Sequence, residues 1–184
     1  MICLLVFRNI FNGQFGPLNQ FLLDMGWISA RIPFLTDPVL AKITVILVNL
    51  WLGFGASMVM ISGVLSNMDP GMYEAARIDG ASAMKQFRFL TLPHLLRVTA
   101  PLLVMNFSGN FNNFGAVFFL TQGGPANPNY QFAGDTDILI SWIYKLTLDN
   151  QMYSMAAVMS ILIFLVVGSV AFWNFRRTSA FKDV

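Results

Sequence analysis

Four asparagines crowd into one short, otherwise apolar stretch of this chain. They are Asn106, Asn110, Asn112 and Asn113. An asparagine amide both donates and accepts hydrogen bonds, but it carries no charge. Asn106, Asn110 and Asn113 have the i, i+4, i+7 spacing that places side chains on one face of a helix. The stripe therefore indicates hydrogen bonding to a ligand or to another helix rather than covalent chemistry.

An earlier segment carries a second stripe, formed by Asn49, Gly53 and Ala56 beside two aromatic residues. Amides that donate and accept, glycines that leave room and nearby rings suit a neutral polyhydroxylated ligand, since a charged one calls for an ionised partner. The alternative is that Asn and Gly only hold helices together by hydrogen bonds and close packing. We expect a substrate pathway lined by Asn49, Gly53, Asn106, Asn110 and Asn113.

Both stripes fall in charge-free stretches long enough to cross a membrane. The chain has 184 residues, 56% hydrophobic and 11% charged, whereas a soluble domain has about 25% charged residues. Residues 43–65, 98–120 and 151–175 contain no charged residue. At about 1.5 Å per residue, each exceeds the roughly 30 Å hydrocarbon core of a bilayer. The pattern predicts an all-α membrane protein with three complete transmembrane helices.

Two shorter apolar segments do not reach across. Residues 1–11 lack a small-residue cleavage site after them, so we interpret them as the end of a fourth transmembrane helix, in a chain that is N-terminally truncated, rather than as a signal peptide. Residues 137–148 carry apolar side chains at helical spacing, and Asp135 or Thr136 is the expected N-cap. We expect this second segment to form a helix at the outer membrane interface.

Most lysines and arginines fall on one side of the predicted spans. Four lie in the loop 66–97 between the first two spans, and three follow the third span. These cations are Arg77, Lys85, Arg88, Arg97, Arg176, Arg177 and Lys182. By the positive-inside rule, the loop 66–97 and the C-terminus are cytoplasmic.

The cytoplasmic loop contains the signals of a complete short helix. Asp69 can accept hydrogen bonds from the free N–H groups at the helix start, and Pro70 suits the first helical position. Gly80 can adopt the left-handed conformation that ends a helix. A second helix is expected from Ser82 until Pro93 interrupts it. The result is a stiff helical hairpin between two membrane spans.

The spacing within this hairpin resembles the EAA motif of binding-protein-dependent ABC importer permeases. Glu74, Ala75 and Ala76 are followed after three residues by Gly80, and after nine more by Leu90, where isoleucine is usual, and by the Leu-Pro pair of the motif. In that family the segment is the coupling helix, which sits in a cleft of the cytoplasmic ATP-binding subunit. The resemblance implies an ATPase-docking face formed by Glu74, Ala75, Ala76 and Gly80.

The similarity extends along almost the whole chain to the larger permease subunits of maltose/maltodextrin ABC importers. Residues 49–53 (NLWLG), 110–114 (NFNNF) and 120–125 (LTQGGP) resemble the segments N-T-W-L-G, N-F-N-N-F and L-T-N-G-G-P of those subunits. The resemblance implies a MetI-like permease fold. It also implies that maltose or maltodextrin is held by the residues that match the family's sugar contacts, Asn49, Gly53, Asn110 and Asn113.

The same resemblance implies the partners and the location. They are a second permease subunit, two copies of an ATP-binding subunit, an extracytoplasmic sugar-binding protein and the lipid of a bacterial inner membrane. The chain has no G-x-x-x-x-G-K-[ST] phosphate loop, so it is expected to hold no cofactor, and ATP and Mg²⁺ fall to the partner subunits. Asn106 and Ala56 replace a serine and a tyrosine of the family, which leaves the exact sugar open.

Several classes of function are disfavoured by composition. One cysteine and one histidine provide no disulfide framework or zinc site, and 11 Lys and Arg against 9 Asp and Glu give no electrostatic footprint for nucleic acid. The spans contain no nucleophile with a base and no paired carboxylates, so an enzyme is not expected. Two alternatives stay open: an ABC permease for another sugar or polyol, and a structural membrane subunit that transports nothing.

Overall fold

The computed structural model of the chain describes residues 1–177, apart from the side chains of Val104, Ser108 and residues 174–177. Lys182, one of the cations predicted to be cytoplasmic, lies outside the described residues. The side chains of the two arginines that precede it also lie outside them.

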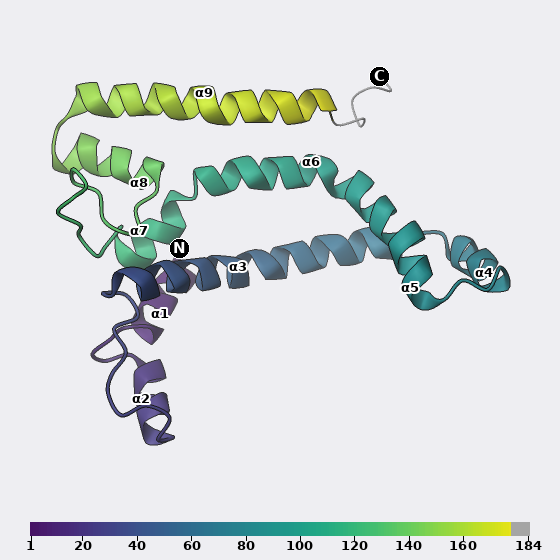
Figure 1. Cartoon of the computed structure of the whole chain (residues 1–184), viewed down its shortest axis with the longest axis horizontal. Helices are drawn as coiled ribbons and strands as arrows, with labels where there is room; N and C mark the ends of the chain where they lie inside the picture. The colour runs from purple at the N-terminus through teal and green to yellow at the C-terminus, as the bar shows by residue number, and fades with distance from the viewer. Residues whose placement is uncertain (178–184) are drawn as a thin grey trace. The chain divides into compact units, whose positions relative to one another are not determined.

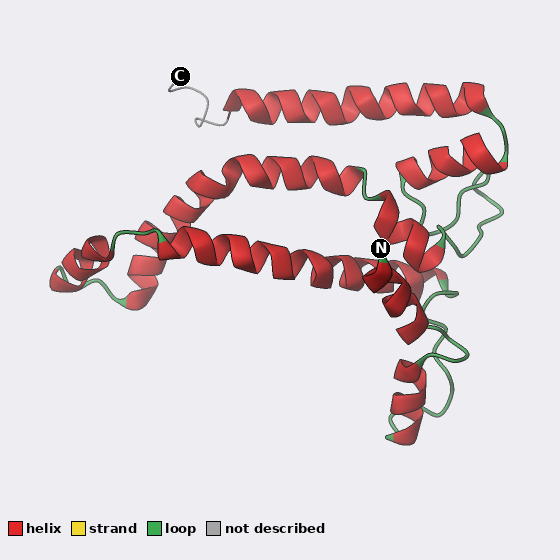
Figure 2. Cartoon of the chain, turned by 180° about the vertical axis from the view of Figure 1, so that it is seen from behind, coloured by secondary structure: helices red, strands yellow, loops and turns green. Residues whose placement is uncertain are grey.

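Helices dominate the chain (Figure 1), and its described part contains one isolated β-bridge, between Ala126 and Gly134, and no named strand (Figure 2). The fold is all-α, as predicted. In chain order the α-helices and two π-helical segments are α1 (Ile2–Ile10), α2 (Pro17–Asp24), α3 (Pro38–Ser66), α4 (Pro70–Ile78), α5 (Ala83–Gln86), η1 (Phe87–Thr91), α6 (Leu92–Phe111), α7 (Phe114–Thr121), α8 (Leu139–Tyr144), η2 (Lys145–Asp149) and α9 (Tyr153–Arg177).

The chain forms two compact units. The first comprises residues 1–51 and 109–169, and the second begins with residues 52–108 and continues from residue 170. The first unit has a small apolar core, in which Leu4 of α1, Val48 of α3 and Leu120 of α7 are buried. Around it pack the half-buried side chains of Phe7, Phe11, Leu35, Val45 and Phe119. This core fixes the start of α3 against α7.

Aromatic rings join α7 to α8 within the first unit. Phe114 stacks on Phe118 with 4.7 Å between ring centroids, and Tyr144 lies 5.0 Å from the first ring and 5.1 Å from the second. Contacts between rings at these distances add about 0.5–1.5 kcal/mol beyond the apolar area they bury. The aromatic cluster thus holds the outer helix α8 beside α7.

Helix α3 begins with a side-chain cap and a proline. Asp37 Oδ1 accepts hydrogen bonds from the backbone N–H groups of Val39 at 3.0 Å and Leu40 at 2.9 Å, and Pro38 occupies the first helical position. Both features satisfy or remove donors that a helix start leaves unpaired. The predicted span 43–65 lies entirely within α3.

Two helical stretches, Pro38–Ser66 and Tyr153–Trp173, are long and apolar enough to cross a membrane, and only 11% and 6% of their most apolar windows are buried. The segments Ala83–Leu103 and Met105–Thr121 qualify together as one bent pair. Helices this apolar and this exposed need lipid or other helices around them.

The second predicted span, 98–120, is not one continuous helix. Helix α6 ends at Phe111 and α7 begins at Phe114. Asn113 caps the new helix, because its side-chain oxygen accepts the backbone N–H of Ala116 at 3.4 Å. Asparagine side chains compete for backbone hydrogen bonds in this way, which favours a helix start over a helix interior.

The second unit contains the predicted cytoplasmic hairpin, and its first helix is confirmed at both ends. Asp69 Oδ1 accepts the backbone N–H of Gly71 at 2.8 Å, and α4 starts at Pro70. At the other end Gly80 has φ +73°, its N–H binds the carbonyl of Arg77 at 3.0 Å, and the N–H of Ala81 binds the carbonyl of Ala76 at 2.9 Å. This pair of bonds is a Schellman motif, which terminates helices at a left-handed residue.

The second helix of the hairpin continues past Pro93, which the sequence predicts as an interruption. It runs through the π-helical turn η1, where Leu92 N–H bonds back to the carbonyl of Phe87, and on into α6. A proline ring clashes with the carbonyl four residues earlier in a regular α-helix, whereas a wider π-turn directly before it relieves that clash. The proline is therefore accommodated rather than terminating the helix.

The helix predicted over residues 137–148 is observed over residues 139–149, and its predicted cap is wrong. It has an α-helical part, α8, followed by the π-helical η2. Neither Asp135 nor Thr136 caps it, because the first binds Asn127 Nδ2 at 3.0 Å and the second donates to the carbonyl of Gly124 at 2.6 Å. Ser141 Oγ accepts the N–H of Ile138 instead, at 3.0 Å.

Candidate functional site

Three of the predicted pathway asparagines form a continuous chain of amide hydrogen bonds inside the first unit. Asn113 Nδ2 donates to Asn49 Oδ1 at 2.7 Å, and Asn49 Nδ2 donates to Asn110 Oδ1 at 3.3 Å. Asn49 and Asn113 are half-buried, whereas Asn110 is exposed. The chain links the middle of α3 to both sides of the break between α6 and α7. The two polar stripes therefore meet.

The break makes this meeting possible. Because α6 stops before Asn113, that residue uses its amide oxygen to cap α7 and its amide nitrogen to reach Asn49. Polar backbone at a broken helix is tolerated at membrane depth only where protein or a water-filled cavity surrounds it. A break that carries amides is thus a place where a polar ligand can exchange hydrogen bonds with the protein.

The other two predicted pathway residues lie one helical turn away along the same helices. Gly53 follows Asn49 on α3 and is exposed, with open space for 4 Å around the point where a Cβ would lie. Asn106 precedes Asn110 on α6 and is also exposed. Both belong to the second unit, whereas the amide chain belongs to the first. Their role in binding a substrate stays a prediction.

The predicted docking residues of the hairpin are open to an approaching partner. Glu74, Ala75 and Gly80 are exposed and Ala76 is half-buried. Large apolar side chains are exposed beside them, including Ile78 at 87%. Among the described residues nothing covers this surface.

The hairpin is braced against the helix that follows it. The hydroxyl of Tyr73 lies 2.9 Å from the hydroxyl of Thr91 and 3.3 Å from the sulfur of Met68. Gln86 Nε2 donates to the carbonyl of Ala81 at 2.9 Å. Because Met68, Gln86 and Thr91 are buried, these contacts exclude competing water. These contacts hold α4 against η1, the segment that leads directly into α6.

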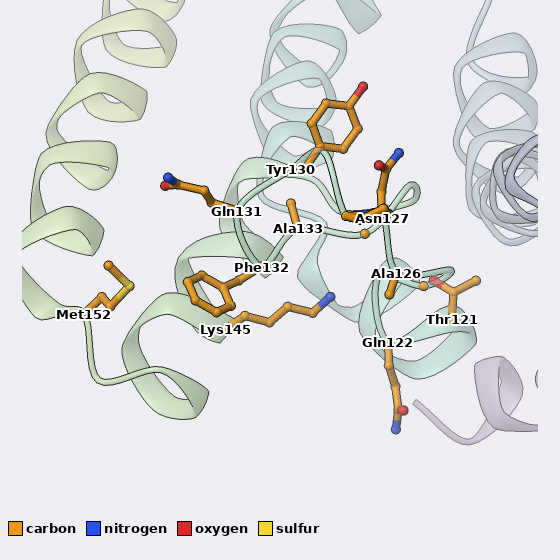
Figure 3. Close-up of a pocket in the computed structure, with 13 residues that line it drawn as sticks. Thr121, Gln122, Ala126, Asn127, Tyr130, Gln131, Phe132, Ala133, Lys145 and Met152 are labelled. Atoms are coloured by element: carbon orange, nitrogen blue, oxygen red, sulfur yellow. The ribbon is translucent and has the colours of Figure 1, made fainter.

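The loop 122–138 between α7 and α8, called the outer loop below, contains a hollow that was not predicted from the sequence. The hollow measures about 780 Å³ and lies between the loop after α7 and the start of α9 (Figure 3). Phe132, Gln131 and Met152 surround this space, and Lys145 runs beneath the loop. The available signal was the run GGPANPNY at 123–130, whose turn residues predict an ordered loop that projects side chains.

Asp137 holds this loop in shape. Its carboxylate is 2% exposed, and it accepts hydrogen bonds from the backbone N–H of Gly134 at 2.7 Å, from Ser141 Oγ at 2.8 Å and from Lys145 Nζ at 2.5 Å. A buried carboxylate needs this many partners because burial removes its hydration. The ion pair also neutralises the charged lysine that lines the hollow.

Two solved structures of bacterial ABC transporters share this fold. The chain superimposes with a TM-score of 0.81 and 22% identity on the crystal structure of a bacterial ABC transporter involved in the import of the acidic polysaccharide alginate, covering 98% of this chain and 61% of that one. A second structure is the bacterial alginate ABC transporter in complex with an alginate pentasaccharide-bound periplasmic protein. It gives a TM-score of 0.77 and 23% identity, over 94% of this chain and 58% of that one.

Residues 1–180 match the family of binding-protein-dependent transport system inner membrane components, and the chain belongs to that family. Its relatives include the galactooligosaccharides permease GanP of Bacillus subtilis, 41% identical over 99% of this chain and 43% of the relative. They also include the maltodextrin permease MdxF of the same species, which is 38% identical over 99% of this chain and 43% of the relative. The maltose/maltodextrin permease MalF of Vibrio cholerae is 39% identical over 96% and 34%.

These relatives are permeases and not enzymes, as the sequence predicts. The chain spans less than half the length of each of them. Their names divide between galactooligosaccharides and maltodextrins.

Proposed function

We propose that this chain is a transmembrane permease subunit of an ABC importer for neutral oligosaccharides of the maltodextrin type. An extracytoplasmic sugar-binding protein delivers the sugar, and a second permease subunit completes the pathway. Two copies of an ATP-binding subunit, which hold ATP and Mg²⁺, supply the energy. The chain lies in a bacterial inner membrane as a multi-pass protein with its C-terminus in the cytoplasm.

The observation that carries the proposal is the amide chain from Asn113 through Asn49 to Asn110. Each amide has both donors and acceptors, so a sugar hydroxyl can replace one amide partner without leaving a polar group unpaired. Transporters commonly place such exchangeable groups at helix breaks near the middle of the bilayer. The absence of Asp, Glu, Lys and Arg from 43–65 and 98–120 favours an uncharged substrate.

Energy enters through the hairpin in this proposal. Glu74, Ala75, Ala76 and Gly80 dock on the ATP-binding subunit, and closure of that subunit displaces α4 as a rigid body. The Tyr73–Thr91 contact passes the displacement to α6, whose far end carries Asn110. Rigid elements that pack in two discrete arrangements are what converts such a displacement into alternating access.

A galactooligosaccharide substrate is the second candidate, because the relative GanP is 41% identical over 99% of the chain. Galactose and glucose differ in the orientation of one hydroxyl, so the same amides can serve either. A binding protein selective for one sugar would then determine the substrate.

Uptake assays with an amide variant test the proposal. The chain is co-expressed with a companion permease, an ATPase and a sugar-binding-protein subunit in cells without other oligosaccharide importers. Uptake of radiolabelled maltotriose and galactotriose is measured for the wild type and for Asn49→Ala. We expect one sugar to be taken up by the wild type, and the variant to lose about tenfold in uptake rate because two hydrogen bonds are removed.

Ser57→Ala is the matched control, since that hydroxyl only donates to the carbonyl of Gly53 in its own helix at 2.8 Å. Unchanged uptake in Asn49→Ala would contradict the assignment of the amide chain. A wild type that takes up neither sugar would favour the polyol permease or the structural subunit that transports nothing.

A further inference from the structure

We propose that the hollow in the outer loop is a second binding site for a neutral oligosaccharide, at the entrance to the amide site. This inference rests on the proposed function and extends it, because the sites of that proposal are the amide chain and the docking hairpin. The hollow lies wholly within the first unit, which also contains the amide chain.

The hollow has the chemistry of a sugar site. Sugars combine hydroxyl groups with apolar C–H faces, so they need both hydrogen-bonding groups and aromatic surface. Phe132 and Tyr130 are 53% and 56% exposed, and no other ring among the described residues packs on either. No hydrogen bond within that described part engages the side-chain amide of Gln131. These groups are available to a ligand.

The charge balance of the hollow favours an uncharged ligand. Lys145 is the one charged residue in its lining, and its ammonium group already pairs with the buried carboxylate of Asp137. An ammonium group has three N–H donors, so donors remain for hydroxyl oxygens. An anionic ligand would have to compete with Asp137 for the same lysine.

One residue that lines the hollow, Phe132, is strained. It has φ +59°, whereas the φ +53° of Gln122 belongs to the left-handed cap that ends α7. Such conformations cost about 1–3 kcal/mol each and persist where the surroundings fix them, often at ligand sites. At Phe132 the conformation holds the ring at the hollow rather than in the core (Figure 3).

The hollow and the amide chain lie at opposite ends of the same short helix. Asn113 caps the start of α7, and Thr121 at its last turn lines the hollow. Eight helical residues span about 12 Å. A disaccharide can therefore occupy only one of the two places at a time, whereas a long oligosaccharide can contact both.

Chain length is consequently the variable that tests the inference. Uptake is measured with the complete assembly in cells, for maltose and for maltohexaose, and for galactobiose and galactohexaose if the wild type transports only galactosides. In the double variant Gln131→Ala/Phe132→Ala we expect KM for the hexasaccharide to rise about tenfold, and KM for the disaccharide to change less than about twofold. The single variant Phe132→Trp keeps both Gln131 and an aromatic ring, so it should keep the wild-type KM.

The matched control is Gln14→Ala/Phe15→Ala, which removes the same side chains from the loop before α2. Phe15 is 86% exposed, and the control should change neither KM. The amount of each variant in the membrane fraction shows whether it folds.

Three results would overturn the inference. If the double variant is present at normal amounts and KM rises equally for the hexasaccharide and the disaccharide, the hollow would be assigned to contact with the binding protein. No change for either length would leave the hollow without a role in sugar binding. A wild type without uptake of any of these sugars would instead remove the proposed function, and this inference with it.

Discussion

At the scale of single residues, the site depends on asparagines that make two kinds of bond at once. Asn113 starts a helix with its oxygen and reaches another helix with its nitrogen. Asn49 donates to one asparagine and accepts from another. Neither a leucine, which forms no hydrogen bond, nor a serine, which is shorter, can reproduce both contacts.

Gly123 is a residue that the outer loop cannot exchange for alanine. It has φ +77°, and an added Cβ would overlap the carboxylate of Asp137 and lie 2.5 Å from Lys145 Nζ. We expect Gly123→Ala to lose at least about 2 kcal/mol of stability, since the left-handed conformation alone costs about 1–2 kcal/mol. The melting temperature of the purified protein in detergent measures this loss.

Gly63→Ala is the control, because nothing lies within 4 Å of an added Cβ there and alanine is the better helix former. If Gly123→Ala and the control have the same melting temperature, the loop around Asp137 must have a different structure.

The ion pair below the outer loop should be measurable by a double-mutant cycle. The side chain of Lys145 is 20% exposed, and Asp137→Asn leaves it without its anion. We expect this substitution to cost about 3 kcal/mol of stability. Adding Lys145→Met removes the unpaired charge and should recover part of that loss. Melting temperatures of the wild type, the two single variants and the double variant give the coupling. Strictly additive effects would contradict a direct interaction between the two side chains.

At this scale the sequence predicted that Asn106, Asn110 and Asn113 share one helix face, but α6 ends at Phe111 and Asn113 caps α7 instead. Asn110 and Asn113 nevertheless both bond to Asn49, so the two polar stripes meet as separate helices rather than as two continuous faces.

The sequence did not predict the hollow. Residues 121–134 have no periodicity, and the shape of that loop depends on Asp137 and Lys145, which lie beyond it in the sequence. Spacing arguments apply within one regular element, so contacts between a loop and a later helix escape them.

At the scale of secondary-structure elements, the hairpin that begins with α4 is the part that the sequence specified most completely. Asp69, Pro70 and Gly80 act through local backbone chemistry, and each occupies the position that this chemistry predicts. The helix break at Asn112 was not predicted, because the stretch 98–120 is apolar enough for one span and hydropathy does not resolve a cap within it. Two adjacent asparagines are the signal that indicates such a cap.

A proline at the end of α4 tests whether the hairpin docks on an ATPase subunit. Proline requires φ near −65°, whereas Gly80 has φ +73°. Gly80→Pro therefore removes the Schellman motif and changes the direction in which the chain leaves α4. We expect the ATP-binding subunit to be lost from the complex on affinity purification, with at least about tenfold less recovered.

Ala83→Pro is the matched control, because it places a proline at the first position of α5, where no intrahelical N–H bond is lost. Recovery of the ATP-binding subunit in equal amounts with both proline variants would show that this hairpin is not the docking element.

At the scale of the whole molecule, the positive-inside rule predicts that the hairpin is cytoplasmic and that the loop 122–138 faces outward. The natural Cys3 is first replaced by alanine, and single cysteines are then introduced as Ile78→Cys and Asn129→Cys. A membrane-impermeant thiol reagent added to intact spheroplasts should label the second variant and not the first, and lysis should expose the first. Labelling of Ile78→Cys in intact spheroplasts would contradict the predicted topology.

In the proposed function, ATP hydrolysis by partner subunits moves a neutral oligosaccharide past the amide chain of this permease. The most direct test uses proteoliposomes that hold the complete assembly, with the binding protein and labelled maltohexaose or galactohexaose on one side and ATP on the other. We expect one of the two sugars to accumulate only when ATP is present, and its accumulation to fall about tenfold with Asn49→Ala. Accumulation that persists without ATP, or that is equal in the variant, would contradict the proposed function.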